Sequence, residues 1–249
     1  MTGKSFVLTV SQSKRLIAKG VAALPEVRQA MEEGMVAVGR GTTNAYVVEE
    51  LLGRSINKAA YVSGRTLPTG MEDPLPAKSM AEVVLRKGQL VEGLSAGEAA
   101  RQMGPGDVFI KGANALNYRA KIAGILMGHS TGGTIGSAIG PVVAGRVHLI
   151  VPVGMEKEVP FDIPEASRIL ASVGGQAESL MPVFGRIITE LEAVRILFPV
   201  EAVPIGCGGI LGAEGSVRLY VYGEEGAVEN AARFIEALYS EPPFAAWVE

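Results

Sequence analysis

Short apolar runs bounded by glycine and followed by helical stretches most limit how this chain can fold. Gly34–Gly39 places four apolar residues between two glycines, and the turn Arg40–Asn44 and the helical pattern of Ala45–Leu52 follow at once. Val108–Ile110 and Val147–Val153 are two further apolar runs of strand length. Strands that helices cover on both faces are apolar throughout, and strand, glycine-containing turn and helix form half of a parallel βαβ unit. The sequence therefore predicts an α/β fold built on a doubly wound parallel sheet.

Helical spacing of apolar residues predicts the elements around this sheet. Ser11–Glu33 has the pattern of an opening helix, which Pro25 divides in two, and Ser95–Met103 has the pattern of a second helix. Residues 57–90 contain three prolines and little periodicity. We interpret them as a short strand near Ala59–Val62 followed by a surface loop.

The composition changes near Ile187, which predicts two domains. We expect an α/β ligand-binding domain over 1–180 and a small α+β subdomain with a C-terminal tail over 187–249. Strand material, a glycine-rich connection, an alternating strand and an amphipathic helix follow one another there, over Ile187–Pro204, Gly206–Gly215, Ser216–Tyr222 and Glu224–Tyr239. We expect a homo-oligomer, formed through the strand edges of this subdomain or through a tail that carries Phe244 and Trp247.

The charge balance and the few metal-binding side chains exclude several classes of protein. The chain has 23 Lys and Arg against 26 Asp and Glu, and both signs are scattered, so no basic stripe suits nucleic acid. One cysteine cannot form an intramolecular disulfide, and with two histidines it cannot supply a structural zinc site. We expect a reducing, cytoplasmic location and neither metal nor cofactor. Cys207 is interpreted as a small buried residue.

One segment is long and uncharged enough to require a membrane test. Ile122–Gly145 contains no Asp, Glu, Lys or Arg. Seven glycines, a proline and several hydroxyl residues make it poor in large apolar side chains. A buried strand, a loop and a buried helix describe it better than a membrane span, and residues 1–15 lack the pattern of a secretory signal.

The turn after the first apolar run is a candidate anion site. A strand that opens through such a turn into a helix offers free backbone N–H groups, hydroxyl donors and the positive end of the helix dipole, which suit a phosphate or carboxylate. The other interpretation is a tight turn in which Thr42 or Thr43 only caps the helix. The candidate ligand-binding residues of this turn are Gly39, Arg40, Gly41, Thr42, Thr43 and Asn44.

Gly128-His-Ser-Thr-Gly132 matches the nucleophile elbow of serine hydrolases. In the α/β-hydrolase fold that carries this elbow, the histidine follows the serine and the acid in the chain, but His129 adjoins Ser130, His148 lies inside the next predicted strand, and no histidine follows. A serine hydrolase is therefore the least favoured function. We interpret this segment as backbone that approaches a ligand, with Ser130, Thr131, Gly132, Gly133 and Thr134 as candidate binding residues.

The order of these motifs resembles the superfamily of ribose-5-phosphate isomerase A, glucosamine-6-phosphate deaminase and the CoA-transferases. Gly34–Gly53 resembles its opening helix, strand, glycine turn and helix. Asp107–Asn117, the glycine-rich segment 128–140 and Val147–Lys157 look like the later part of the lactate-utilisation (LUD) domains, which share that fold. The resemblance covers about 11–170 and implies a phosphate or acyl-carrier site at the strand ends.

The same comparison bears on the reaction. Sugar-phosphate isomerases of this type carry an acidic loop after the strand, where this chain has Lys111-Gly-Ala-Asn-Ala115, so the loop lacks their carboxylates. Lys111, Gly112 and Asn114 are instead candidate binders. The CoA-transferases use a glutamate nucleophile, which the sequence does not place; Glu156 and Glu72 are candidate carboxylates.

Three functions remain open. The first is binding of a small anionic metabolite, phosphorylated, carboxylate or CoA-type, at the glycine-rich strand-end loops, with the reaction undetermined. The second is an isomerase or transferase that uses a carboxylate such as Glu156. The third is an assembly or regulatory protein with a vestigial enzyme domain. Fold alone does not decide among them.

Overall fold

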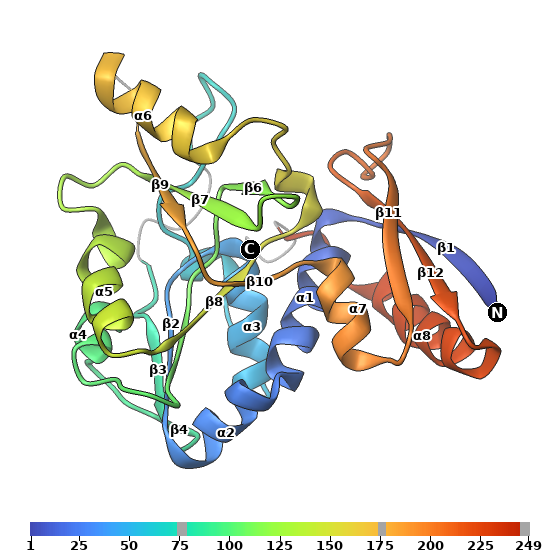
Figure 1. Cartoon of the computed structure of the whole chain (residues 1–249), viewed down its shortest axis with the longest axis horizontal. Helices are drawn as coiled ribbons and strands as arrows, with labels where there is room; N and C mark the ends of the chain where they lie inside the picture. Colours follow the sequence, from blue (N-terminus) through green and yellow to red (C-terminus); the bar gives the residue numbers. More distant parts are fainter. Residues whose placement is uncertain (74–78, 174–177, 245–249) are drawn as a thin grey trace.

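A six-stranded sheet forms the centre of the computed structural model, which describes residues 1–73, 79–173 and 178–244 (Figure 1). Its order is β10-β8-β5-β2-β3-β4; the first four strands run parallel, β3 pairs antiparallel with β2, and β4 pairs antiparallel with β3. The chain is therefore α/β with a mostly parallel central sheet, as predicted. The strands are β2 (Met35–Val38), β3 (Val83–Arg86), β4 (Gln89–Leu90), β5 (Val108–Ile110), β8 (His148–Pro152) and β10 (Arg186–Ile188).

Helices cover both faces of this sheet. Along β2, Val36 and Val38 join one core cluster, whereas Met35 and Ala37 join the other. Because successive side chains of a strand point to opposite faces, a strand buried on both sides must be apolar throughout. The first face packs against α1 (Val10–Ala23), α2 (Pro25–Glu33), α3 (Thr42–Leu52) and α7 (Glu190–Leu197), and the second against α4 (Ala96–Ala100) and α5 (Gly133–Ala144).

A small antiparallel sheet lies at the top of the molecule in Figure 1. Its order is β6-β7-β9, and α6 (Ile163–Val173) packs against it. The apolar segment that begins at Ile122 supplies its central strand and then α5, so the predicted order of strand, loop and helix is confirmed. The helix was expected to be buried, but only one face of α5 is, and Val143 is exposed. The strands are β6 (Ala115–Asn117), β7 (Ile122–Met127) and β9 (Ser179–Val183).

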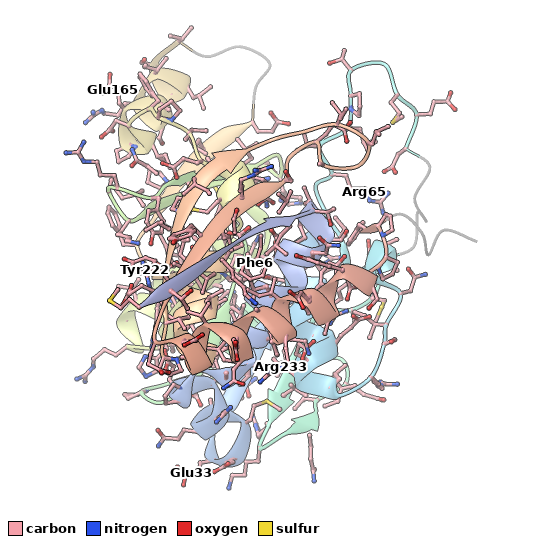
Figure 2. The ribbon with its side chains drawn as sticks, turned by 90° about the vertical axis from the view of Figure 1, so that its right-hand side faces the viewer. Phe6, Glu33, Arg65, Glu165, Tyr222 and Arg233 are labelled. Atoms are coloured by element: carbon pink, nitrogen blue, oxygen red, sulfur yellow. The ribbon has the colours of Figure 1, made fainter. Side chains whose placement is uncertain are left out.

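The third sheet joins the two ends of the described chain. β1 (Thr2–Leu8) pairs antiparallel with β12 (Val217–Gly223), and β12 pairs with β11 (Glu201–Cys207). Figure 2 shows this side of the molecule, with Phe6 of β1 and Tyr222 of β12 labelled beside α8 (Glu225–Ala237). The predicted alternating strand and amphipathic helix are confirmed. The predicted segment 187–249 therefore does not contain this whole sheet, because β1 comes from the start of the chain. Its first two residues belong to β10 of the central sheet.

Two local predictions are wrong. Ile187–Pro204 was expected to be strand, but α7 occupies its middle, because Thr189 and Glu192 form a reciprocal capping box at its first turn. Residues near Ala59–Val62 form a 3₁₀ helix, η1 (Lys58–Tyr61), rather than a strand, and the expected surface loop contains β3 and β4.

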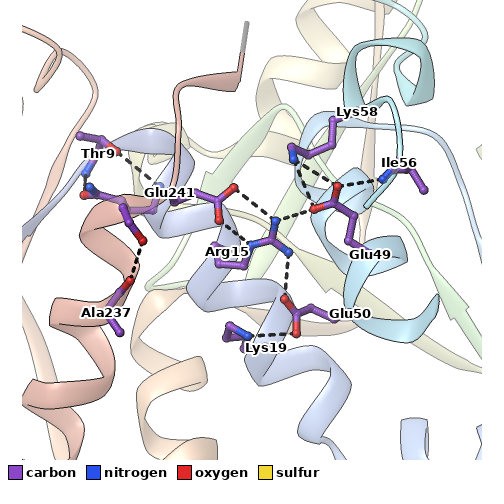
Figure 3. Close-up of polar contacts among 11 residues, drawn as sticks. Thr9, Arg15, Lys19, Glu49, Glu50, Ile56, Lys58, Ala237 and Glu241 are labelled. Carbon is purple, nitrogen blue, oxygen red and sulfur yellow. Dashed lines mark hydrogen bonds and ion pairs between the residues drawn. The ribbon is translucent and has the colours of Figure 1, made fainter. Parts of the chain in front are cut away.

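A network of charged side chains ties α1 to α3 and to the C-terminal segment (Figure 3). The Arg15 guanidinium donates to Glu50 and Glu241, each at 2.8 Å, and to Glu49. The Lys58 ammonium also donates to Glu49, at 3.2 Å. Phe244 packs against Tyr46 within the same chain, with ring centroids 6.3 Å apart; Trp247 lies outside the described residues.

Candidate functional site

The loops that follow four neighbouring strands meet at one edge of the central sheet. Gly39, after β2, donates its N–H to Ile110 O of β5 at 2.9 Å. The backbone N–H of Lys111, after β5, donates to Ile150 O of β8 at 3.0 Å. The backbone N–H of Val153, after β8, donates to Ile188 O of β10, also at 3.0 Å. The carboxyl ends of parallel strands are where α/β proteins place their ligands. These loops therefore define the strand-end site: residues 39–44, 111–113, 154–157 and 189–190.

Two hydrogen bonds hold the turn after β2, one to η1 and one within the turn. Gly41 donates its N–H to Tyr61 O at 3.0 Å, and the Asn44 side-chain amide donates to Gly39 O at 2.7 Å. No side chain caps α3, so the expectation that Thr42 or Thr43 caps this helix is wrong. The Thr43 hydroxyl and the Asn44 side-chain oxygen are buried without a hydrogen-bond partner. Unpartnered buried polar atoms are uncommon and call for an explanation.

Lys111 extends across the first residue of this turn. A Cβ on Gly39 would lie 2.9 Å from the lysine Cδ, so a larger residue there would displace the lysine. The ammonium donates to Gly112 O at 3.4 Å. Burial lowers the pKa of Lys111, and the charge of Glu82 opposes this effect. Thr134 is another predicted site residue. Its hydroxyl donates at 2.5 Å to the same Glu82 carboxylate.

A second lysine comes to the same loop from the turn η2 (Met155–Lys157). The Lys157 ammonium donates to Ala113 O at 2.7 Å, so two lysine head groups lie on consecutive carbonyl groups. Burial, assisted by the charges of Lys14 and Lys111 against those of Glu156 and Glu190, lowers the pKa of Lys157 to about 8.

Glu156 is the predicted carboxylate that the structure brings to this site. Its Oε1 accepts from the Lys14 ammonium at 3.3 Å, while its Oε2 is buried without a partner. A Cβ on Gly154 would lie 1.7 Å from that Oε2, so glycine is needed for the carboxylate to fold back over the turn. Glu72, the other candidate, is exposed in a surface segment.

Glu190 is a functional candidate that sequence reasoning missed. It is 0 % exposed at the start of α7; its Oε2 accepts from Met155 N at 3.0 Å and its Oε1 has no partner. Burial, and next the charge of Glu156, raises the pKa of Glu190 to about 7. The capping-box spacing from Thr189 to Glu192 marks a helix start directly after a strand, and this signal would have placed Glu190 at the strand ends.

The remaining predicted residues lie elsewhere or face solvent. Asn114 is exposed, and its side-chain oxygen accepts from Leu126 N at 3.0 Å, which fixes the small sheet. Ser130 and Thr131 are exposed, and the His129 ring lies 2.9 Å from the Thr131 hydroxyl. The glycines 132 and 133 both adopt left-handed φ values, 77° and 57°, where α5 begins.

Two expectations about single side chains are wrong. His148 is exposed at the amino end of β8, opposite the strand-end site, instead of being buried inside the strand. Cys207 is exposed at the end of β11, because that strand forms an open edge of its sheet. Partial burial, followed by the charges of Glu190 and Glu156, raises the pKa of the Cys207 thiol, which disfavours the nucleophilic thiolate.

Two surface hollows lie away from the strand ends. One of about 320 Å³ is lined by residues that include Arg146, His148 and Arg186, at the amino ends of β8 and β10. The other, of about 290 Å³, lies beside β11 and β12. Across the described ranges, no group of three or more His, Cys, Asp or Glu side chains is arranged to hold a metal ion. Within those ranges no helix has the length and apolar character to cross a membrane.

The chemistry open to the strand-end site follows from its two kinds of charged group. Lysine head groups on one loop attract an anion, and the Glu190 carboxyl, whose pKa is raised to about 7, can exchange protons with a ligand. No family model matches the sequence, and no curated protein or solved structure is significantly similar to it.

Proposed function

We propose that this protein binds a small anionic metabolite, carrying a phosphate or carboxylate group, at the strand-end site. One observation carries the proposal: Lys111 and Lys157 place their ammonium groups on the consecutive carbonyls of Gly112 and Ala113. Neither lysine forms an ion pair within 4.0 Å with a described residue. The charge of Lys111 acts on Lys157, so the two like charges repel each other, and an anion bound near both reduces that repulsion.

The Arg15 network differs from the two lysines in its carboxylate partners, as expected for a cation with a structural role. Arg15 has three carboxylates as direct partners, those of Glu49, Glu50 and Glu241. Within the described part of the chain, Lys111 and Lys157 have no carboxylate as a direct partner, although burial lowers the pKa of each. Their arrangement therefore resembles an anion-binding site more than a folding contact.

The turn after β2 supplies further groups for this ligand. The Thr43 hydroxyl is a buried donor without a partner, and Arg40 Nε is also buried and unpartnered. The amino end of α3, which no side chain caps, adds the positive end of a helix dipole. An anion that reaches this turn would satisfy groups that otherwise cost free energy when buried. Membership of the superfamily suggested by the motif order, and self-association, remain predictions.

Proton-transfer catalysis on the bound anion is a second candidate function. The specific observation is the pair Glu156 and Glu190, each with one buried carboxylate oxygen that lies within hydrogen-bond geometry of no described residue. The raised pKa of Glu190 lets it give or take a proton near neutral pH. This is the isomerase or transferase alternative, with carboxylates from η2 and α7, because the loop after β5 has none.

Titration calorimetry with inorganic phosphate tests the binding proposal. We expect Lys111→Met to weaken binding about tenfold or more, because a charge-assisted hydrogen bond contributes about 1.5–3 kcal/mol. Thr43→Val should weaken it less, and Lys4→Met, which changes an exposed lysine of β1, should leave it unchanged. Equal affinity for Lys111→Met and Lys4→Met would contradict the proposal. Mass spectrometry of small molecules released from the purified protein would then identify the natural ligand.

A further inference from the structure

Lys157 lies at the centre of the charged groups at the strand-end site. The residue is partly buried, and its ammonium donates to Ala113 O, in the loop after β5, at 2.7 Å. Four charged groups act on it from the elements packed around it: Lys14 of α1, Lys111 after β5, Glu156 of its own turn and Glu190 of α7. We propose that Lys157 is a nucleophile that forms an imine with a carbonyl group of the bound anion, an inference that rests on the proposed function.

Its surroundings make Lys157 a better nucleophile than an ordinary lysine. Only the neutral amine attacks a carbonyl carbon, and desolvation together with neighbouring cations favours that form. With the pKa lowered to about 8, about one tenth of the side chain is neutral at pH 7. An unperturbed lysine is neutral to well under 0.1 % at that pH.

The other two lysines of the site are suited to different roles. Lys14 is 5 % exposed and pairs with Glu156 at 3.3 Å, so it is neither free nor accessible. Burial lowers the pKa of Lys111 too, but the charge of Glu82 opposes that effect, and the side chain lies across Gly39 of the candidate anion-binding turn. Lys111 therefore holds the phosphate or carboxylate of the ligand while Lys157 reacts with its carbonyl.

The reaction needs no oxidant or reductant. The lone pair of the Lys157 Nζ forms a C–N bond to the carbonyl carbon, and the C=O π pair moves to oxygen, which takes up a proton. The nitrogen loses a proton, which gives a carbinolamine. A second proton then adds to the hydroxyl group, which leaves as water while the nitrogen lone pair forms the C=N bond, and the nitrogen loses its remaining proton to give the imine. Amine and carbonyl compound thus yield imine and water. Glu156 and Glu190, whose charges act on Lys157, are the carboxyl groups that give and take these protons.

This assignment narrows the substrate class. The ligand carries an aldehyde or ketone group and, a few bonds away, a phosphate or carboxylate. Small 2-oxo acids and phosphorylated ketones or aldehydes meet both conditions. We therefore choose pyruvate, glyoxylate and dihydroxyacetone phosphate as probes.

Reductive trapping tests the proposal on the full chain. Each probe is incubated with the protein and sodium cyanoborohydride, which converts an imine into a stable secondary amine, and the modified lysine is located by peptide mass spectrometry. We expect at least one probe to modify Lys157 in preference to the other lysines, and inorganic phosphate to protect it. Lys157→Arg keeps the positive charge and should bind phosphate but form no adduct. Lys4→Arg, at an exposed position, should react like the parent protein.

The outcomes separate the two proposals. If the parent protein binds phosphate but no probe gives an adduct, or if the adduct forms at Lys111 or persists in Lys157→Arg, the imine proposal is overturned and anion binding stands. If calorimetry shows that the parent protein does not bind phosphate, the anion site itself is wrong, and the imine proposal fails with it.

Discussion

Replacing Glu190 by glutamine should make the protein more stable at alkaline pH and leave its stability at pH 5 nearly unchanged. Glu190 is 0 % exposed, and its Oε1 has no partner. A glutamine can still accept the hydrogen bond from Met155 N that Glu190 Oε2 now accepts at 3.0 Å. The substitution therefore removes the buried ionisable group while it preserves that contact.

The size of the effect follows from the two pKa values. In the unfolded chain the Glu190 carboxyl ionises near its ordinary pKa of 4.5, whereas in the folded protein it holds its proton up to about 7. Between these values only the folded state is protonated, so stability falls as pH rises. Each pH interval of 1 costs about 1.4 kcal/mol, which gives about 3 kcal/mol over the whole window. Above pH 7 the full loss is present.

Urea unfolding of the parent protein and Glu190→Gln at several values between pH 5 and pH 8 measures this effect. We expect the difference in unfolding free energy to grow with pH toward about 3 kcal/mol in favour of the variant. Glu229→Gln, at an exposed position of α8, should follow the parent protein throughout. A difference that does not change with pH would show that Glu190 is not held in its protonated form, and would refute the reasoning.

Three further predictions concern the rest of the chain. Arg15→Met should lower the unfolding free energy by about 3 kcal/mol in urea titrations, because it leaves the carboxylates around Arg15 without their shared partner; a loss below about 1 kcal/mol would contradict this. A fluorophosphonate probe should not label Ser130, since the neighbouring His129 ring lies against Thr131; labelling that disappears in Ser130→Ala would show otherwise. We predict that the chain self-associates through the open edge strand β11, so Ile205→Lys on that strand should reduce the mass measured by light scattering; an unchanged mass would exclude this edge as the contact.

The central sheet was predictable because its strands have a local signature. A strand covered on both faces must be apolar throughout, which identified β2, β5 and β8 from short stretches of sequence. The pairing of β1 with β12 was not predictable, because Thr2 and Gly223 meet only through the folded chain and neither segment specifies its partner. The sequence also did not show which sheet β7 joins, because an apolar strand does not specify its partners; it lies in the small antiparallel sheet.

The strand-end site was predictable in its position and only partly in its chemistry. The loops that begin at Gly39 and Lys111 were identified because a glycine turn after a buried strand is a local pattern. Lys157 and Glu190 were not, because their importance depends on burial and on neighbours from α1 and α7. A charged residue after a strand is ordinarily solvated, so only the assembled site distinguishes these two side chains.

Diffraction from crystals soaked in selenate tests the central claim most directly, because anomalous scattering locates this phosphate-like anion without reference to any assumed site. We predict a selenate position about 3 Å from the ammonium groups of both Lys111 and Lys157, lost in the double variant Lys111→Met/Lys157→Met. A selenate bound only in the hollow that includes Arg146 and Arg186, with the strand-end site empty, would contradict the account.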